Sequence, residues 1–164
     1  MLPERLRVGY GEDAHRLASG RRLVIGGVYI ESSPRGAQAH SDGDVLLHAT
    51  SDALLSSVAL GDIGSFFPPS DPQYHNADSG LLLQRLLEHI HSQVGALKLI
   101  NLAAVVTLDS PKLGSYRRRI EQQLATLLAS LDADATRIAV SFKTSEGLAP
   151  DHVQARVSLL LALP

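Results

Sequence analysis

The chain has 164 residues, of which 45% are hydrophobic, and this is enough for one compact domain with a sizeable core. Its formal net charge of -2 gives no general attraction to nucleic acid or to an anionic membrane, so partners of these kinds are not expected. It contains no cysteine, which excludes disulfides and thiolate metal ligands and leaves histidine and aspartate as ligands for a transition metal.

Two further features bear on domain organisation and location. The sequence has no recognisable targeting peptide and no apolar run near the roughly 18 residues of a membrane span. We therefore expect one domain covering residues 1–164, in the cytoplasm of a bacterium or in the plastid stroma of a eukaryote.

Hydrophobic periodicity predicts eight elements, beginning with a short strand at 6–10 and a second strand at 23–30 that Gly26-Gly27 interrupts. The remaining elements are helices at 45–60, 80–94 and 116–131 and strands at 99–108, 137–143 and 153–163. The order strand, strand, helix, helix, strand, helix, strand, strand predicts an α+β domain with helices packed on one face of a sheet. The last predicted strand, 153–163, is so apolar that the sheet is also expected to be buried further in an oligomer.

Two segments between these elements are expected to be irregular. The segment 31–39 is rich in Ser, Pro and Gly, and we expect a mobile loop that folds over a ligand. The segment 61–68 is punctuated by glycines and fits neither a helix nor a strand. It can equally be an ordinary connector.

A polar stretch, His40-Ser41-Asp42-Gly43-Asp44, leads directly into the first predicted helix. Asp44 is a good N-cap because its carboxylate can accept hydrogen bonds from the first free amides of that helix. His48 then lies about one turn inside the helix, and Asp52 follows it by four residues and projects from the same face. A carboxylate in that place can orient an imidazole or bind substrate. The alternative is a capped core helix with one satisfied histidine.

A second polar cluster places Asp13 and His15 two residues apart, just after the first predicted strand. Residues at this spacing share a face in extended backbone. Together with His48 they can form a three-ligand site of nitrogen and oxygen with an open fourth position, as in catalytic zinc sites. The alternative is a turn carboxylate beside a surface histidine.

The second half of the chain contains one polar turn and one basic run of interest. Thr144-Ser145-Glu146-Gly147 follows the strand predicted at 137–143. Hydroxyls beside a carboxylate in such a turn can hold phosphate oxygens and a hard divalent cation, or they can form an ordinary polar turn. The run Arg117-Arg118-Arg119 is interpreted as a solvated helix face.

Five strings in the first half occur in a specific order and at specific separations. They are Arg7-Val8-Gly9-Tyr10-Gly11-Glu12-Asp13-Ala14-His15, Ile25-Gly26-Gly27-Val28, His40 to His48, Asp52-Ala53-Leu54, and Gly61-Asp62-Ile63-Gly64 to Phe67-Pro68. Together they closely resemble the 2-C-methyl-D-erythritol 2,4-cyclodiphosphate synthases of the non-mevalonate isoprenoid pathway. The second half resembles this family more weakly, through Pro111-Lys112 and Thr144-Ser145-Glu146.

The resemblance implies a fold, an assembly and a reaction. The fold is the ferredoxin-like α+β architecture of these synthases, and the assembly is a homotrimer with active sites at subunit interfaces. The reaction converts the cytidine diphosphate-linked substrate 4-diphosphocytidyl-2-C-methyl-D-erythritol 2-phosphate into 2-C-methyl-D-erythritol 2,4-cyclodiphosphate and CMP, which is the activity of a phosphorus-oxygen lyase. Since the 2-phosphate of the substrate attacks its own β-phosphorus, no protein nucleophile is needed.

The resemblance also implies roles for individual residues. Asp13, His15 and His48 match the ligands of a zinc ion (Zn²⁺), and Glu146 matches the protein ligand of a second divalent ion, magnesium or manganese. His40 and Thr144 match positions that stabilise the transition state. Further matches are to substrate contacts: Ser41, Asp52, Asp62, Ile63, Gly64, Phe67 and Asp71 near the methylerythritol and diphosphate, and Pro111, Lys112, Leu113 and Ser145 in the nucleotide pocket.

Two departures from the family pattern fall in the second half. Leu113-Gly114-Ser115-Tyr116 stands where the family has a further apolar pair followed by Pro-His, and a shorter loop, 149–152, follows Leu148. Two other functions therefore stay open. One is a metal-dependent phosphohydrolase that uses the same three ligands, and the other is a diverged, non-catalytic trimer that binds a nucleotide.

Overall fold

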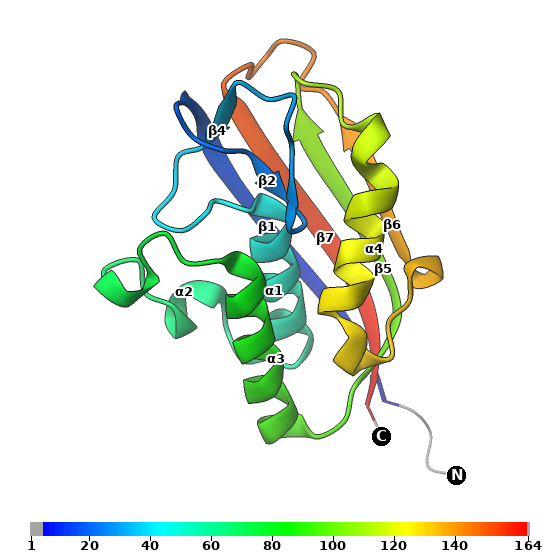
Figure 1. The fold of residues 1–164 in the computed structure, drawn as a ribbon. Helices are drawn as coiled ribbons and strands as arrows, with labels where there is room; N and C mark the ends of the chain where they lie inside the picture. The colour runs from blue at the N-terminus through cyan, green and yellow to red at the C-terminus, as the bar shows by residue number, and fades with distance from the viewer. Residues whose placement is uncertain (1–4, 164) are drawn as a thin grey trace.

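The computed structural model describes residues 5–163, which form a five-stranded sheet with helices packed on one of its faces (Figure 1). The strand order is β4-β1-β7-β5-β6, and β5 and β6 are the one parallel pair in this sheet. The strands are β1 Arg5–Ser19, β4 Arg35–Ala37, β5 Lys98–Leu108, β6 Ile138–Lys143 and β7 His152–Leu163. The predicted α+β arrangement is confirmed.

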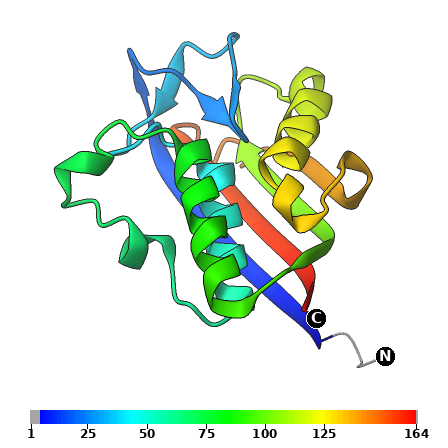
Figure 2. The same cartoon turned by 60° about the horizontal axis from the view of Figure 1, so that its bottom comes forward.

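The helices form a layer over the sheet. Within residues 5–163 the α-helices are α1 Val45–Ser57, α2 Ile63–Phe66, α3 Ser79–Val94 and α4 Arg117–Leu127, and single 3-10 turns occur at Pro72–Tyr74, Gly114–Tyr116, Ala129–Leu131 and Ala135–Arg137. Helix α1 lies against β1 and β7, α3 covers α1 from outside, and α4 packs near β6 (Figure 2). None of the helices described has the length and hydropathy that crossing a bilayer requires.

The core lies between the sheet and this helical layer. Alternate residues of β7 face the helices, and Val153, Ala155, Val157, Leu159 and Leu161 are at most 2% exposed. The opposite face of the sheet has no helix over it in residues 5–163, and there the side chains of Leu6, Val8 and Tyr10 on β1 are 54%, 71% and 53% exposed. An apolar, uncovered face of this kind is typical of an association surface.

Two glycines let α1 lie directly on β1. A Cβ atom built on Gly9 would lie 2.0 Å from the carbonyl oxygen of Ala53, and one built on Gly11 would lie 2.2 Å from that of Ala49. The free edge of β1 is closed at the same place, because Ser56 Oγ accepts from the Tyr10 amide at 3.0 Å and donates to the Tyr10 carbonyl at 2.8 Å. This close approach brings the N-terminal part of α1 over the middle of β1.

Asp44 anchors the start of α1, as the sequence predicts. Its buried carboxylate accepts hydrogen bonds from the Leu46 and Leu47 amides of the helix and from the Gly26 and Gly27 amides. The two glycines have positive φ angles of 62° and 75° and form the turn of a hairpin, β2 Val24–Ile25 and β3 Val28–Tyr29. The expectation of one interrupted strand at 23–30 is therefore wrong: the segment reverses direction at the glycines.

Other predicted boundaries also change. Strand β1 continues to Ser19, so Asp13 and His15 lie within a strand rather than in a turn after it. The segment 61–68, expected to be irregular, contains α2, whose N-cap Asp62 accepts from the Ser65 amide at 2.9 Å. The segment 31–39 contributes β4 to the sheet. Helices α1 and α4 end at Ser57 and Leu127, before the predicted residues 60 and 131.

Candidate metal centre and substrate site

The three residues predicted as metal ligands meet in the structure. Asp13 and His15 lie on the face of β1 that α1 covers, and His48 descends from the first turns of α1. Asp13 Oδ2 lies 2.9 Å from His48 Nδ1 and 3.0 Å from His15 Nε2. One ligand atom from each residue falls in a cluster in which all three are within 4.8 Å of one another.

The chemistry of this cluster fits a transition metal. Two imidazoles and one carboxylate are the donor set of many catalytic zinc sites. His15 Nε2 is buried and has no hydrogen-bond partner among the described residues, because the nearby Asp13 oxygen lies outside hydrogen-bond geometry. A buried nitrogen without a partner costs free energy unless a further group binds it. A metal ion shared with Asp13 and His48 would satisfy this nitrogen.

Asp13 and His48 each favour the charged form of the other. Burial favours the neutral acid of Asp13, but the hydrogen bond to His48 and the adjoining imidazole of His15 outweigh it and hold the pKa of that carboxyl well below its usual range. Burial likewise disfavours the charged form of His48, but the hydrogen bond to Asp13 outweighs it and raises the pKa of that imidazole. A metal ion therefore competes with a proton for Nδ1 of His48.

A hollow of about 190 Å³ borders the metal cluster. It is lined by His15 and His48, by the predicted residues His40, Ser41, Ile63, Gly64 and Phe67, and also by Ala39, Pro69, Tyr74 and Leu82. We call it the metal-side hollow. It places the imidazole of His40 and the hydroxyl of Ser41 beside the two histidines of the metal cluster.

Three predicted carboxylates do not line this hollow and instead cap backbone amides around it. Asp52 Oδ1 accepts from the Ile63 amide at 2.7 Å, which ties the 61–64 loop to α1 one turn beyond His48. Burial raises the pKa of Asp52, because it outweighs the hydrogen bond from the Ile63 amide, which lowers that pKa. Asp62 caps α2, and Asp71 accepts from the Gln73 amide at 3.0 Å in the next turn. In this structure their visible contribution is to shape the loops that carry Ile63, Gly64 and Phe67.

A second hollow, of about 340 Å³, lies toward the other edge of the sheet, where β5 and β6 end. The predicted residues Lys112, Leu113, Thr144 and Glu146 line it, together with Leu108, Gly114, Arg117, Phe142 and Lys143. We call it the cationic hollow, since three basic side chains border it. The guanidinium of Arg117 lies 5.4 Å from the centre of the Phe142 ring and borders the hollow, while Arg117, Arg118 and Arg119 are all exposed, as the sequence predicts.

The turn that carries Thr144 and Glu146 is organised by Asp109. Its carboxylate accepts from the Ser145 amide at 2.5 Å, the Ser145 hydroxyl at 2.8 Å and the Gly147 amide at 3.2 Å. These bonds hold the pKa of Asp109 below its usual range. Ser145 and Pro111 therefore flank the cationic hollow rather than line it. Thr144 Oγ1 donates to Glu146 Oε1 at 2.5 Å, which places a hydroxyl beside a carboxylate, as the sequence predicts.

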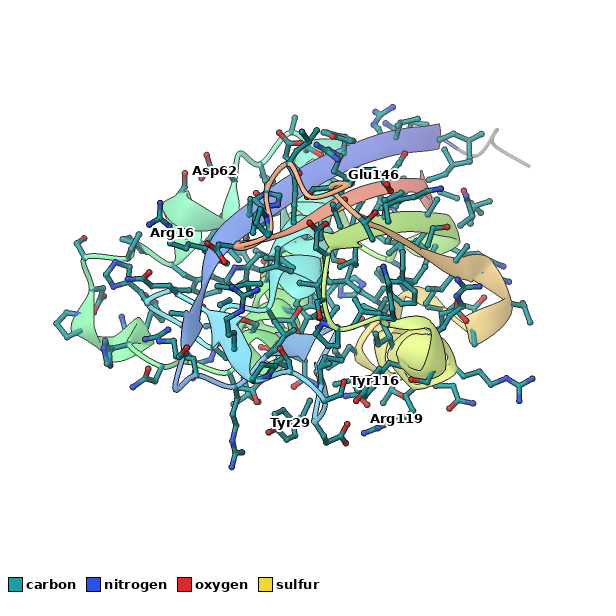
Figure 3. The ribbon with its side chains drawn as sticks, turned by 90° about the horizontal axis from the view of Figure 1, so that it is seen from above. Arg16, Tyr29, Asp62, Tyr116, Arg119 and Glu146 are labelled. Carbon is teal, nitrogen blue, oxygen red and sulfur yellow. The ribbon has the colours of Figure 1, made fainter. Side chains whose placement is uncertain are left out.

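The two hollows are far apart within one chain. They share no lining residue. Across the sheet His15 pairs with Val153, Val153 with Leu108, and the neighbouring Thr107 with Lys143. The metal cluster on β1 and the end of β6 are therefore three strand positions apart in the sheet. Because neighbouring strands lie about 4.8 Å apart, this separates the two sites by roughly 14 Å. In Figure 3 the labelled side chains of Asp62 and Glu146, which belong to the two regions, also stand well apart.

Known proteins share both the sequence and the fold. The YgbB family model matches residues 6–162. The 2-C-methyl-D-erythritol 2,4-cyclodiphosphate synthase of Thermus thermophilus is 51% identical over 156 residues, which cover 95% of this chain and 99% of that protein. The synthase of the same name from Deinococcus radiodurans is 52% identical over 155 residues, covering 94% of this chain and 93% of that one.

A solved structure extends the comparison to three dimensions. A 2C-methyl-D-erythritol-2,4-cyclodiphosphate synthase in a form with bound CDP superimposes with a TM-score of 0.85 and 47% identity, covering 94% of this chain and 99% of that one. The family model, the sequence relatives and the solved structure agree over nearly the whole chain. The chain belongs to the YgbB family, whose members named here are cyclodiphosphate synthases.

Proposed function

We propose that this protein converts 4-diphosphocytidyl-2-C-methyl-D-erythritol 2-phosphate into 2-C-methyl-D-erythritol 2,4-cyclodiphosphate with release of CMP, as a phosphorus-oxygen lyase. The observation that supports this most strongly is the cluster of Asp13, His15 and His48 at the edge of a hollow that His40 and Ser41 also line. The names of its relatives, at about half of all positions identical, support the same reaction.

The chemistry asks the protein to neutralise charge and to fold the substrate. The attacking 2-phosphate and the attacked diphosphate are both anionic and lie in one molecule, so correct geometry replaces a protein nucleophile. A zinc ion on Asp13, His15 and His48 would supply a Lewis acid that draws charge from the diphosphate. His40 and Ser41, which line the metal-side hollow, would donate hydrogen bonds to phosphate oxygens on which charge develops.

The cationic hollow is the proposed nucleotide pocket. Lys112, Arg117 and Lys143 offer positive charge to the nucleotide phosphates, and the solved relative with bound CDP shows that a family member takes a cytidine diphosphate. Thr144 would donate to the departing phosphate. Glu146 would hold a second divalent ion, magnesium or manganese, because hard cations of this kind bind carboxylate oxygens and phosphates together.

One chain alone cannot bring these parts to one diphosphate. The metal cluster and Glu146 would both have to reach the same diphosphate, yet roughly 14 Å separates the two sites within a chain. We therefore propose a homotrimer in which the metal-side hollow of one subunit faces the cationic hollow of its neighbour. The uncovered sheet face with exposed Leu6, Val8 and Tyr10 supplies apolar surface for such an assembly.

Phosphorus NMR of a reaction mixture tests the function. The purified protein is incubated with the substrate and magnesium, with and without a zinc chelator. Synthase activity gives a coupled pair of cyclic diphosphate resonances together with CMP, and chelation suppresses them. Linear phosphates would instead identify a phosphohydrolase, and unchanged substrate from zinc-loaded protein would identify a non-catalytic binding protein.

A further inference from the structure

We propose that Ser79 and Asp42 form a hydrogen-bond relay that positions His48, holding a proton on Nε2 so that Nδ1 is presented to the metal. Neither residue touches the substrate hollow, so both act through His48. The inference rests on the metal centre of the proposed function, and it assigns to two further residues the task of setting the affinity of that centre.

The relay runs from the imidazole to a carboxylate. His48 Nε2 lies 2.8 Å from Ser79 Oγ. The Ser79 hydroxyl in turn donates to Asp42 Oδ1 in a short hydrogen bond, and the Ser79 amide donates to Asp42 Oδ2 at 2.9 Å. Both oxygens of the Asp42 carboxylate are thus directed at the same serine.

The donor and acceptor capacities of these groups fix the direction of the relay. A carboxylate only accepts hydrogen bonds, so the one hydroxyl proton of Ser79 goes to Asp42. The serine oxygen is then left with lone pairs alone toward His48, and it can bind that ring only if Nε2 carries a proton. The other ring nitrogen, Nδ1, is 2.9 Å from Asp13 Oδ2 and is the atom that belongs to the metal cluster.

The surrounding backbone keeps the relay in place. Ser79 is 1% exposed at the start of α3, and the segment before it is tied to the 40–42 segment by the bond from the Asp42 amide to the Ala77 carbonyl at 3.1 Å. The Asn76 amide makes a second tie, to the His40 carbonyl at 2.7 Å. The relay therefore joins the N-terminus of α3 to the loop that leads into α1.

Ser41 is a weaker partner for the same nitrogen. Its hydroxyl oxygen lies 3.3 Å from His48 Nε2, which is longer than the Ser79 contact, and it also accepts from the Gly43 amide at 3.2 Å. Among residues 5–163 the Ser41 hydroxyl donates to no carboxylate that would fix the position of its proton, whereas the Ser79 hydroxyl donates to Asp42. Ser79 is therefore the residue that determines which nitrogen of the His48 imidazole carries the proton.

A group that accepts a hydrogen bond from the ring nitrogen that does not bind the metal has two effects on a metal-ligating histidine. It fixes the rotation of the ring, and it makes the ligating nitrogen more basic by accepting the opposite proton. Loss of such a partner typically weakens metal binding 10–100-fold. We expect the same range for Ser79→Ala, and a similar loss for Asp42→Asn, because an amide in that place no longer draws the serine proton with a full charge.

The test measures zinc affinity by competition with a chromophoric chelator. The variants are Ser79→Ala and Asp42→Asn, and the matched control is Ser51→Ala. Ser51 is also a buried serine, at 1% exposure, and it lies on α1 three residues after His48, but its hydroxyl donates to the Leu47 carbonyl at 2.9 Å. The relay predicts a 10–100-fold weaker affinity in the two relay variants and an affinity within about twofold of wild type in the control.

A second readout reports on the proton itself. In nitrogen-15 NMR spectra of the zinc-loaded protein, the Nε2–H of His48 should appear as a slowly exchanging signal that Ser79→Ala broadens or removes and Ser51→Ala leaves unchanged. Relay variants that bind zinc as wild type does, or zinc-loaded wild type without that signal, would overturn the proposal. The affinity measurement needs no turnover, so protein that binds zinc but forms no cyclic product refutes the proposed function and still tests the relay.

Discussion

Replacing Asp44 by alanine should destabilise the protein by several kcal/mol although the side chain touches neither the metal ligands nor the hollows. Its carboxylate, 0% exposed, accepts four backbone amides, from Leu46 and Leu47 at 3.1 and 3.0 Å and from Gly26 and Gly27 at 2.9 and 2.7 Å. One group therefore caps α1, sets the position of His48 and fixes the turn between β2 and β3. Alanine leaves all four amides without a partner.

The magnitude follows from the number of bonds and the charge of the acceptor. A hydrogen bond to a charged group contributes about 1.5–3 kcal/mol, and the desolvation cost of a buried carboxylate offsets several kcal/mol of the total. The net loss for Asp44→Ala is then about 4 kcal/mol, a large part of the 5–15 kcal/mol that a typical domain has. Asp44→Asn keeps one accepting oxygen but turns an N–H toward Gly27, and it should lose about 2 kcal/mol.

Urea unfolding followed by circular dichroism measures both losses. The control is Asp78→Ala, since Asp78 is an exposed N-cap that accepts from the Leu81 amide at 3.0 Å, and its loss should cost about 1 kcal/mol. The order of stability should be wild type, Asp78→Ala, Asp44→Asn, Asp44→Ala. If Asp44→Ala loses no more than Asp78→Ala, the carboxylate is not the anchor that the structure indicates.

Three further predictions concern the site. His48→Ala should lose bound zinc and nearly all turnover while the fold survives, and elemental analysis with circular dichroism checks this; full activity would refute the assignment. The pKa of His48 is raised above 6.5 and that of Asp13 is lowered below 3.8, so their ion pair stabilises the metal-free protein fully between about pH 3.8 and 6.5. This stabilisation is lost as the pH rises through the raised pKa of His48 or falls through the lowered pKa of Asp13. Zinc competes with the proton of His48, so the affinity for zinc should rise as the pH rises toward the raised pKa of that imidazole. A zinc affinity that does not change with pH would contradict this. Glu146→Gln should mainly raise the magnesium concentration needed for half-maximal rate, and an unchanged metal titration would count against its role as a ligand.

The residues of the metal cluster could be predicted from sequence, but their local structure could not. The spacing of Asp13 and His15 already placed both side chains on one face of extended backbone, and β1 confirms that face. The sequence nevertheless suggested that the strand ended at residue 10, because its inward positions are Gly9, Gly11, Asp13 and His15. Glycine and polar side chains hide the alternation that marks a strand, and the close approach of α1 that requires them is a tertiary feature.

The remaining surprises also depend on tertiary contacts. Ser79 follows the helix cap Asp78 and looks like ordinary capping sequence, and only the packing of α3 beside the 40–44 loop brings its hydroxyl to His48. Arg117 belongs to a run of three arginines on a polar helix, and only β6 supplies the Phe142 ring that brings it to the cationic hollow. The separation of the two hollows likewise follows from strand order, which periodicity does not specify.

Mixed trimers test whether catalysis needs the metal-side hollow of one subunit and the cationic hollow of its neighbour. His48→Ala and the double variant Thr144→Ala/Glu146→Ala should each be inactive alone, and they are refolded together in equal amounts. In random trimers about one quarter of the interfaces combine an intact metal cluster with an intact Thr144–Glu146 pair, so phosphorus NMR should show cyclic diphosphate forming at about one quarter of the wild-type rate. A mixture of folded, exchanging subunits that stays as inactive as its components would contradict a site shared between chains.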